Sequence, residues 1–268
     1  MAIDNTAYQT SEAPSWDDTL SKVPRVTLVF WIVKILATTL GETGGDALSM
    51  QLNLGYAVST LIFLGFFVVT LIAQVGSTHY HPVFYWAVVV ATTTVGTTTS
   101  DYIDRTLKVG YVRSSFSLLA LVIIILLIWR FTTGRIVVDR VTNRRDEVFY
   151  WVTILVSNTL GTALGDYVAS TLGFGFERGA LIFTALILIV AGLHFFSRLP
   201  TSITFWAAYV LTRPLGATLG DLLTKPHAQG GLNISRIAAS LVIAVLMVVM
   251  VAVTGLRHRT SRSTVPAA

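Results

Sequence analysis

Long apolar stretches alternate with more polar hydrophobic segments along the chain. The apolar stretches lie near residues 55–76, 114–129, 179–196 and 237–256, and each is close to the ~20 residues that a membrane-spanning helix needs. A more polar hydrophobic segment precedes each of them, near residues 26–48, 83–103, 148–168 and 203–223. The runs are continuous rather than alternating, which favours helices over the strands of a membrane barrel. We therefore expect an all-α membrane protein with eight transmembrane helices, arranged as four helical hairpins.

The polar segments repeat one pattern four times: a tryptophan, a glycine ten residues later, an aspartate five further on and a second glycine nine after that. The four sets are Trp31, Gly41, Asp46, Gly55; Trp86, Gly96, Asp101, Gly110; Trp151, Gly161, Asp166, Gly175; and Trp206, Gly216, Asp221, Gly230. Self-similarity at a fixed spacing indicates a repeat architecture. Successive tryptophans are 55, 65 and 55 residues apart, which indicates two rounds of duplication. Since each repeat crosses twice, all four run in the same direction, and we expect pseudo-symmetry about the membrane normal.

These spacings divide the chain into consecutive parts. They are a cytoplasmic tail over 1–24, repeat 1 over 25–77, repeat 2 over 78–132, a basic cytoplasmic linker over 133–147, repeat 3 over 148–197, repeat 4 over 198–256 and a second cytoplasmic tail over 257–268.

Composition supports a membrane protein. Hydrophobic residues make up 53% of the chain, charged residues 12%, and the mean hydropathy is +0.70, whereas charged residues are about 25% of soluble domains. The net charge of +5 does not indicate nucleic-acid binding, because the basic residues follow the topology. Eleven Lys and Arg lie on the side of the two termini and six lie in the hairpin loops. The positive-inside rule therefore predicts that both termini are cytoplasmic.

The four tandem repeats, each with two spans and a tryptophan, resemble a bacterial membrane-protein family known only as a repeat of unknown function, often described as an uncharacterised membrane-anchored protein. The resemblance covers residues 25–256. It implies a multi-pass protein of the bacterial inner (cytoplasmic) membrane with the lipid bilayer as its partner. It implies no particular activity.

Each polar segment presents a column of residues spaced four apart, which lie on one helical face. The columns are Lys34, Thr38, Glu42, Asp46; Thr93, Thr97, Asp101; Asn158, Thr162, Asp166; and Arg213, Ala217, Asp221. At 1.5 Å per residue, each aspartate lies about 22 Å beyond its tryptophan, in the outer third of a hydrocarbon layer ~30 Å thick. A carboxylate at that depth is costly unless it faces protein or water.

The columns contain five acids against Lys34 and Arg213, which leaves a surplus of three negative charges. Carboxylate and hydroxyl oxygens suit hard cations such as Mg²⁺, Ca²⁺ and Mn²⁺. The sequence thus predicts a transporter or channel for a small inorganic cation, divalent ions favoured, with a central site and no cofactor other than a bound cation. Its candidate metal ligands are Asp46, Asp101, Asp166 and Asp221. Glu42, Thr38, Thr93, Thr97, Asn158 and Thr162 would line the path, and Arg213 and Lys34 would gate it or supply counter-charge.

The same residues support a second interpretation, in which the repeats only pack and the protein is structural or recruits a partner. Small residues four apart form close helix seams, namely Gly41 with Gly45, Gly96 with Ser100, Gly161 with Gly165 and Gly216 with Gly220. On this interpretation the aspartates cap turns, Arg213 pairs with Glu42 or an aspartate, and Lys34 snorkels towards the interface. We expect Trp31, Trp86, Trp151 and Trp206 to anchor at the interface or to pack.

Enzymatic function is not expected. The chain has no cysteine, and we find no Ser-His-Asp arrangement, phosphate-binding loop or dinucleotide fingerprint. The expected partners are the bilayer and a small cation, without nucleic acid, and the oligomeric state stays open.

Overall fold

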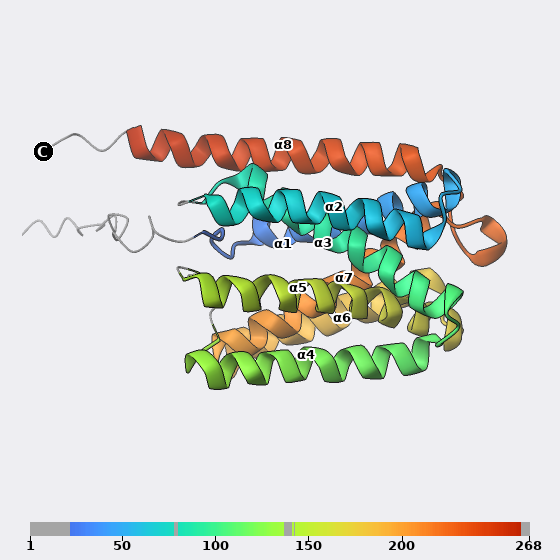
Figure 1. Ribbon diagram of the computed structural model, residues 1–268, viewed down its shortest axis with the longest axis horizontal. Helices are drawn as coiled ribbons and strands as arrows, with labels where there is room; N and C mark the ends of the chain where they lie inside the picture. The colour runs from blue at the N-terminus through green and yellow to red at the C-terminus, as the bar shows by residue number, and fades with distance from the viewer. Residues whose placement is uncertain (1–21, 78–79, 137–140, 142, 264–268) are drawn as a thin grey trace, which may run out of the picture.

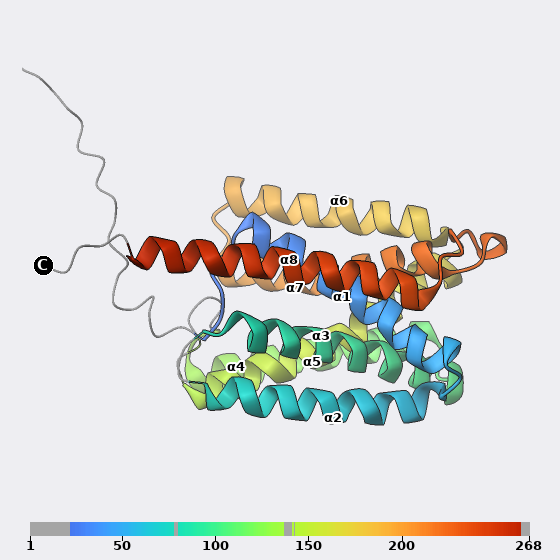
Figure 2. The same cartoon turned by 90° about the horizontal axis from the view of Figure 1, so that it is seen from above.

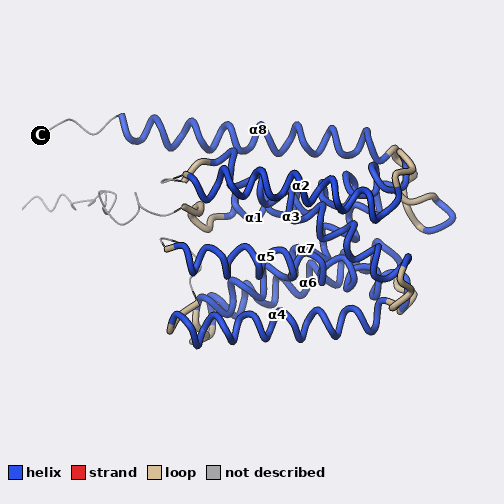
Figure 3. The backbone as a smooth tube through the Cα atoms, in the orientation of Figure 1, coloured by secondary structure: helices blue, strands red, loops and turns tan. Residues whose placement is uncertain are grey.

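The computed structural model describes residues 22–77, 80–136, 141 and 143–263. Most of the predicted first tail, the end of the second tail and part of the basic linker, including Arg140, lie outside the described residues. The described chain is helical without a strand (Figure 3), which confirms the all-α expectation.

The α-helices of the described chain are α1 Leu28–Asp46, α2 Gly55–Gly76, α3 Pro82–Asp101, α4 Tyr111–Thr133, α5 Arg144–Asp166, α6 Gly175–Phe196, α7 Thr201–Thr224 and α8 Arg236–Ser263. Three π-helical segments, η2 Ala47–Gln51, η3 Tyr102–Thr106 and η4 Tyr167–Thr171, continue α1, α3 and α5, and a short 3₁₀ helix, η5 His227–Gln229, follows α7.

The helices form two concentric layers. The first helix of each repeat, α1, α3, α5 or α7, contacts the next one along the chain, and α7 returns to α1, so these four close an inner ring. The outer helices α2, α4, α6 and α8 pack against α3, α5, α7 and α1 respectively. Each repeat therefore covers the inner helix of the following repeat, and α8 completes the circle on α1 (Figures 1 and 2).

The two ends of the bundle differ. The turns inside the hairpins, after Asp46, Asp101, Asp166 and Asp221, gather at one end, which we call the turn end (Figure 1, right). The connections between repeats gather at the other, which we call the junction end. At the turn end the second glycine of each sequence pattern has a positive φ, 72° at Gly55, 86° at Gly110, 75° at Gly175 and 83° at Gly230. Glycine adopts this conformation without steric cost, which explains why the turn repeats it.

In the part of the chain that the structure describes, six helices are long and apolar enough to cross a membrane, which fits an integral membrane protein. They are Leu28–Gln51, Gly55–Gly76, Tyr111–Thr133, Arg144–Thr171, Gly175–Phe196 and Arg236–Thr254. The outer helices α2, α6 and α8 each bury only 17% of their most apolar window inside the protein, so their apolar side chains face outwards, as lipid requires. The inner helices α3 and α7 do not meet the criterion. They carry the threonines and charges of the predicted columns and are enclosed by other helices, so they need no apolar surface of their own.

Three of the four repeated tryptophans lie inside the protein. Trp86, Trp151 and Trp206 are 6%, 3% and 4% exposed, so of the two expected roles, anchoring in the lipid interface or packing, these three residues pack. The physical reason is a cycle of aromatic contacts between neighbouring inner helices near the junction end. Ring centroids lie 5.6 Å apart for Phe30 and Trp86, 5.7 Å for Tyr85 and Trp151, 5.8 Å for Tyr150 and Trp206, and 5.7 Å for Phe205 and Trp31. Aromatic pairs at such separations add packing energy beyond the area they bury.

Candidate functional site

The predicted columns stack as layers inside the inner ring, each layer with one residue from each inner helix. From the junction end to the turn end, the layers are Phe30, Tyr85, Tyr150, Phe205; then Lys34, Val89, Ile154, Tyr209; then Thr38, Thr93, Asn158, Arg213; then Glu42, Thr97, Thr162, Ala217; and finally Asp46, Asp101, Asp166, Asp221. Every one of these residues is at most 5% exposed. Polar and charged groups thus fill the centre of the bundle towards the turn end, and aromatic groups fill it towards the junction end.

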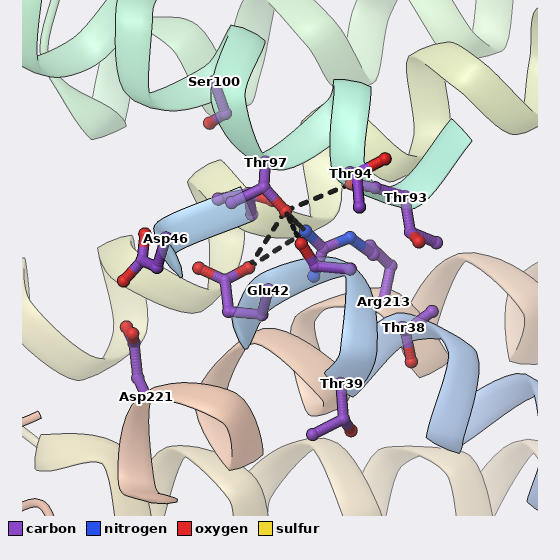
Figure 4. A network of polar contacts seen from close by, with 12 residues as sticks. Thr38, Thr39, Glu42, Asp46, Thr93, Thr94, Thr97, Ser100, Arg213 and Asp221 are labelled. Atoms are coloured by element: carbon purple, nitrogen blue, oxygen red, sulfur yellow. Dashed lines mark hydrogen bonds and ion pairs between the residues drawn. The ribbon is translucent and has the colours of Figure 1, made fainter. Parts of the chain in front are cut away.

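Arg213 occupies the middle of the ring. Its Nη2 donates to Glu42 Oε2 at 3.0 Å, to Thr97 Oγ1 at 2.5 Å and to Thr162 Oγ1 at 2.6 Å (Figure 4). Those partners belong to α1, α3 and α5, so one guanidinium from α7 reaches all three other inner helices. Of the two roles expected for Arg213, the structure shows the ion pair with Glu42.

The four aspartates form two pairs rather than one ring. Arg105 lies 3.0 Å from Asp101 through Nε and 3.1 Å from Asp166 through Nη2. Lys225 Nζ lies 3.1 Å from Asp221 and 3.0 Å from Asp46. Each base follows its own aspartate by four residues and also binds the aspartate of the next repeat. We call these groups the Arg105 clamp (Arg105, Asp101, Asp166) and the Lys225 clamp (Lys225, Asp221, Asp46).

The predicted surplus of negative charge is absent. Arg236 adds a third base from the turn end, with its Nε 3.4 Å from Asp46. The five acids of the columns are therefore equalled in number by five bases, because Arg105, Lys225 and Arg236 join Lys34 and Arg213, although Lys34 contacts the Tyr209 ring and not an acid. Lys225 lies just beyond α7, where burial opposes its charge, but the carboxylates of Asp221 and Asp46 outweigh burial and raise its pKa. These three bases are not among the predicted site residues, because basic residues in the hairpin loops are interpreted as a signal of membrane topology. A usable signal exists, since Arg105 and Lys225 occupy the same place in repeats 2 and 4.

Lys34 is buried rather than snorkelling. Its Nζ lies 4.2 Å from the centroid of the Tyr209 ring, a cation–π arrangement between α1 and α7. Among the described residues Nζ has no hydrogen-bond partner. Asn158 Nδ2 donates to Thr92 Oγ1 at 3.0 Å, and its Oδ1 has no hydrogen-bond partner among the described residues.

The threonine hydroxyls bind mainly to backbone. Thr38 Oγ1 donates to the Ile35 carbonyl at 2.8 Å, and Thr93 Oγ1 donates to that of Val90 at 2.8 Å. Thr97 also donates to the Gly41 carbonyl at 3.1 Å. Asp46, Asp101 and Asp166, in contrast, do not follow the capping interpretation, because neither the π-helical segments after them nor the next helices α2, α4 and α6 begin with a side-chain cap.

The repeated glycines and their neighbours lie where inner helices touch. Gly41, Gly96, Gly161 and Gly216 face Thr93, Asn158, Arg213 and Thr38, and Gly45, Gly165 and Gly220 face Thr97, Ala217 and Glu42. A Cβ added at Gly96 would lie 2.9 Å from the backbone carbonyl carbon of Asn158. Ser100 differs, since its hydroxyl donates to Asp104 at 3.4 Å. These contacts let each column residue of one helix pack directly on the backbone of its neighbour.

Among the described residues, one group of acids has the spacing of metal ligands. Glu42, Asp46 and Asp221 each offer a carboxylate oxygen within 4.8 Å of the others (Figure 4). Only two of the four candidate metal ligands belong to this group, because Asp101 and Asp166 lie in the Arg105 clamp. Oxygen ligands of this kind suit hard divalent cations.

Comparisons with known proteins address the family and not the activity. The family described as Repeat of Unknown Function (DUF347) matches residues 29–80, 84–135, 149–199 and 204–260. No curated protein and no solved structure matches the chain. The four matched segments cover most of the sequence and repeat in the order of the helical hairpins, so this chain belongs to the DUF347 family.

Proposed function

We propose that this protein transports a small inorganic cation, preferably a divalent one, across the membrane through the carboxylates at the turn end of the inner ring. The observation that carries the proposal is the group of Glu42, Asp46 and Asp221, which are 3%, 1% and 2% exposed and bring three oxygens within 4.8 Å. Ionisable side chains within membrane-spanning segments are costly and mark ion pathways by default. Packing alone would need only the small residues of the seams.

The charge balance favours a transporter over an open channel. Each of these acids already contacts a base, so a cation gains strong ligands only when a base moves away. Arg213 also fills the centre of the ring, and the aromatic layer packs the axis towards the junction end. Cation movement therefore requires a second conformation in which the bases and these layers rearrange, which is the behaviour of a carrier.

Neutralising single acids tests the proposal. We expect Asp221→Asn and Asp46→Asn to remain folded and membrane-inserted, and to reduce Mn²⁺, Mg²⁺ or Ca²⁺ flux into proteoliposomes roughly tenfold or more, since even partners of metal ligands change affinity by that factor. Glu177→Gln is the matched control, because Glu177 is an exposed acid at the start of α6 outside the network. Wild-type proteoliposomes that take up none of these ions faster than empty liposomes would contradict the proposal.

A purely structural role is the second candidate. It is favoured by the pairing of each acid with a base and by the threonine hydroxyls that bind backbone carbonyls. On that account the acid substitutions lower the thermal stability of the protein, and wild-type protein carries no cation flux.

A further inference from the structure

The two clamps occupy equivalent places in the two halves of the molecule, yet their bases differ in chemistry. Arg105 is held by four side chains, because besides Asp101 and Asp166 it donates to Tyr111 Oη at 2.9 Å and to Tyr56 Oη at 3.2 Å. Guanidinium is permanently charged, and its fixed fork matches such a set of acceptors. Arg105 is therefore held in one position and stabilises the contact between α3 and α5.

Lys225 is held more simply. Its compact ammonium contacts the carboxylates of Asp46 and Asp221 at 3.0 and 3.1 Å, as a bound inorganic cation would. A third acid, Glu42, lies beside these two, whereas the equivalent position next to the Arg105 clamp is Thr162. Asp46 Oδ1 is buried and has no hydrogen-bond partner among the described residues, so one ligand oxygen remains available.

We propose that the Lys225 clamp is the cation site, that the Lys225 ammonium occupies the place of the metal ion, and that a divalent cation displaces it. The proposal rests on the transport function proposed above and specifies where in the ring the ion binds. The Arg105 clamp holds the other half of the bundle together and binds no ion.

The charges around the site favour a divalent ion. Lys225 and Arg236 both contact Asp46 and stand at the two ends of the loop 226–235. Glu42 keeps its partner Arg213 when those two bases leave. Asp46 and Asp221 then carry two uncompensated negative charges in a buried site, which one divalent cation neutralises.

The loop 226–235 is ordered and contacts the backbone of Lys225 directly. It folds back onto the last turn of α7 through Leu232 N to Leu222 O at 2.7 Å and Asn233 N to Lys225 O at 2.9 Å. Gly231 packs directly against the Lys225 carbonyl, where a Cβ would overlap it. Since the loop contacts Lys225 through its backbone, a shift of the loop displaces the backbone that carries the Lys225 side chain.

Cation-dependent stability of purified protein in detergent tests the proposal. In Lys225→Met we expect Mn²⁺, Mg²⁺ or Ca²⁺ to raise the Tm at concentrations roughly tenfold lower than in the wild type, because removal of an internal competitor raises the apparent affinity. Arg105→Met is the matched control and should lower the Tm without any gain in cation response. Equal cation response of Lys225→Met and wild type, or an equal gain in Arg105→Met, would overturn the proposal.

A second measurement uses the wild-type protein and does not depend on the folding of a variant. A small amine-acylating reagent is added with and without each ion, and labelled lysines are quantified by mass spectrometry. Displacement predicts more labelling of buried Lys225 in the presence of the ion that binds, with unchanged labelling of exposed Lys108. Labelling of Lys225 that is unaffected by all three ions refutes the inference while leaving the transport proposal intact, and absence of wild-type cation flux refutes the transport proposal itself.

Discussion

Arg213 breaks the fourfold pattern of the inner ring and makes the ring a single unit. Its equivalents in the other repeats are Thr38, Thr93 and Asn158, whose side chains are too short to cross the axis. One arginine suffices because its guanidinium reaches Glu42, Thr97 and Thr162 together. Four arginines at this level would repel one another in a medium of low dielectric constant. The asymmetry of the sequence at this position thus has a direct structural cause.

Removing this arginine leaves a buried carboxylate without its partner. We expect Arg213→Met to lower the free energy of unfolding by about 3–5 kcal/mol, because Glu42 keeps its charge or must take up a proton at a cost. Combining it with Glu42→Gln should recover much of that loss, since both members of the pair are then neutral. Chemical unfolding in detergent of the two single variants and the double variant measures the coupling energy. Additive losses would show that the ion pair does not determine the stability of the centre.

The inner helices approach one another through a seam that the spacing of small residues predicts. What the spacing does not predict is the partner of each glycine, which is the column residue of the next repeat rather than another glycine. The second helix of each repeat likewise covers its neighbour and not its own first helix. Both facts depend on how the hairpins pack side by side. Because all four hairpins carry the same sequence pattern, that pattern does not indicate which hairpin packs against which. The sequence therefore identifies the elements, and tertiary packing decides which of them meet.

A methyl group at Gly96 tests the seam. Its Cβ would lie 2.9 Å from the backbone of α5 at Asn158, which cannot move aside as a flexible side chain can. We expect Gly96→Ala to lower the free energy of unfolding by about 1–3 kcal/mol through overpacking. Gly65→Ala in α2 is the control, because nothing lies within 4 Å of the added Cβ and alanine favours helix by up to about 1 kcal/mol. Equal stability of the two variants, measured by thermal unfolding in detergent, would show that the inner helices are not closely packed at Gly96.

At the scale of the whole molecule, the long apolar runs predict the all-α fold and the four hairpins, the spacing of the tryptophans predicts the repeats, and the family match confirms the repeats. The candidate site is predicted less completely. The columns do place Glu42, Asp46 and Asp221 on the inner helices, but counting charges by segment assigns Arg105 and Lys225 to the loops. Those bases fold back onto the acids, so the four aspartates form two ion-paired clamps instead of one ring of unpaired negative charge. A pseudo-twofold relation between halves, already implied by the spacing of the tryptophans, describes the charged centre better than a fourfold one.

The orientation of the bundle is the remaining large-scale prediction, and the absence of cysteine makes it accessible to single-cysteine labelling. Eleven basic residues on the side of the termini against six in the hairpin loops predict that the junction end faces the cytoplasm and the turn end the opposite side. A membrane-impermeant thiol reagent applied to intact cells should therefore label Thr106→Cys and Gln229→Cys at the turn end, and leave His81→Cys and Leu199→Cys at the junction end unlabelled. His81 and Thr106 flank α3, and Leu199 and Gln229 flank α7, the two helices that are not apolar enough to meet the length and hydropathy requirement for a membrane span. Labelling of both members of a pair would show that the enclosed helix does not cross the membrane, and reversed labelling would place the cation site of the Lys225 clamp on the cytoplasmic side.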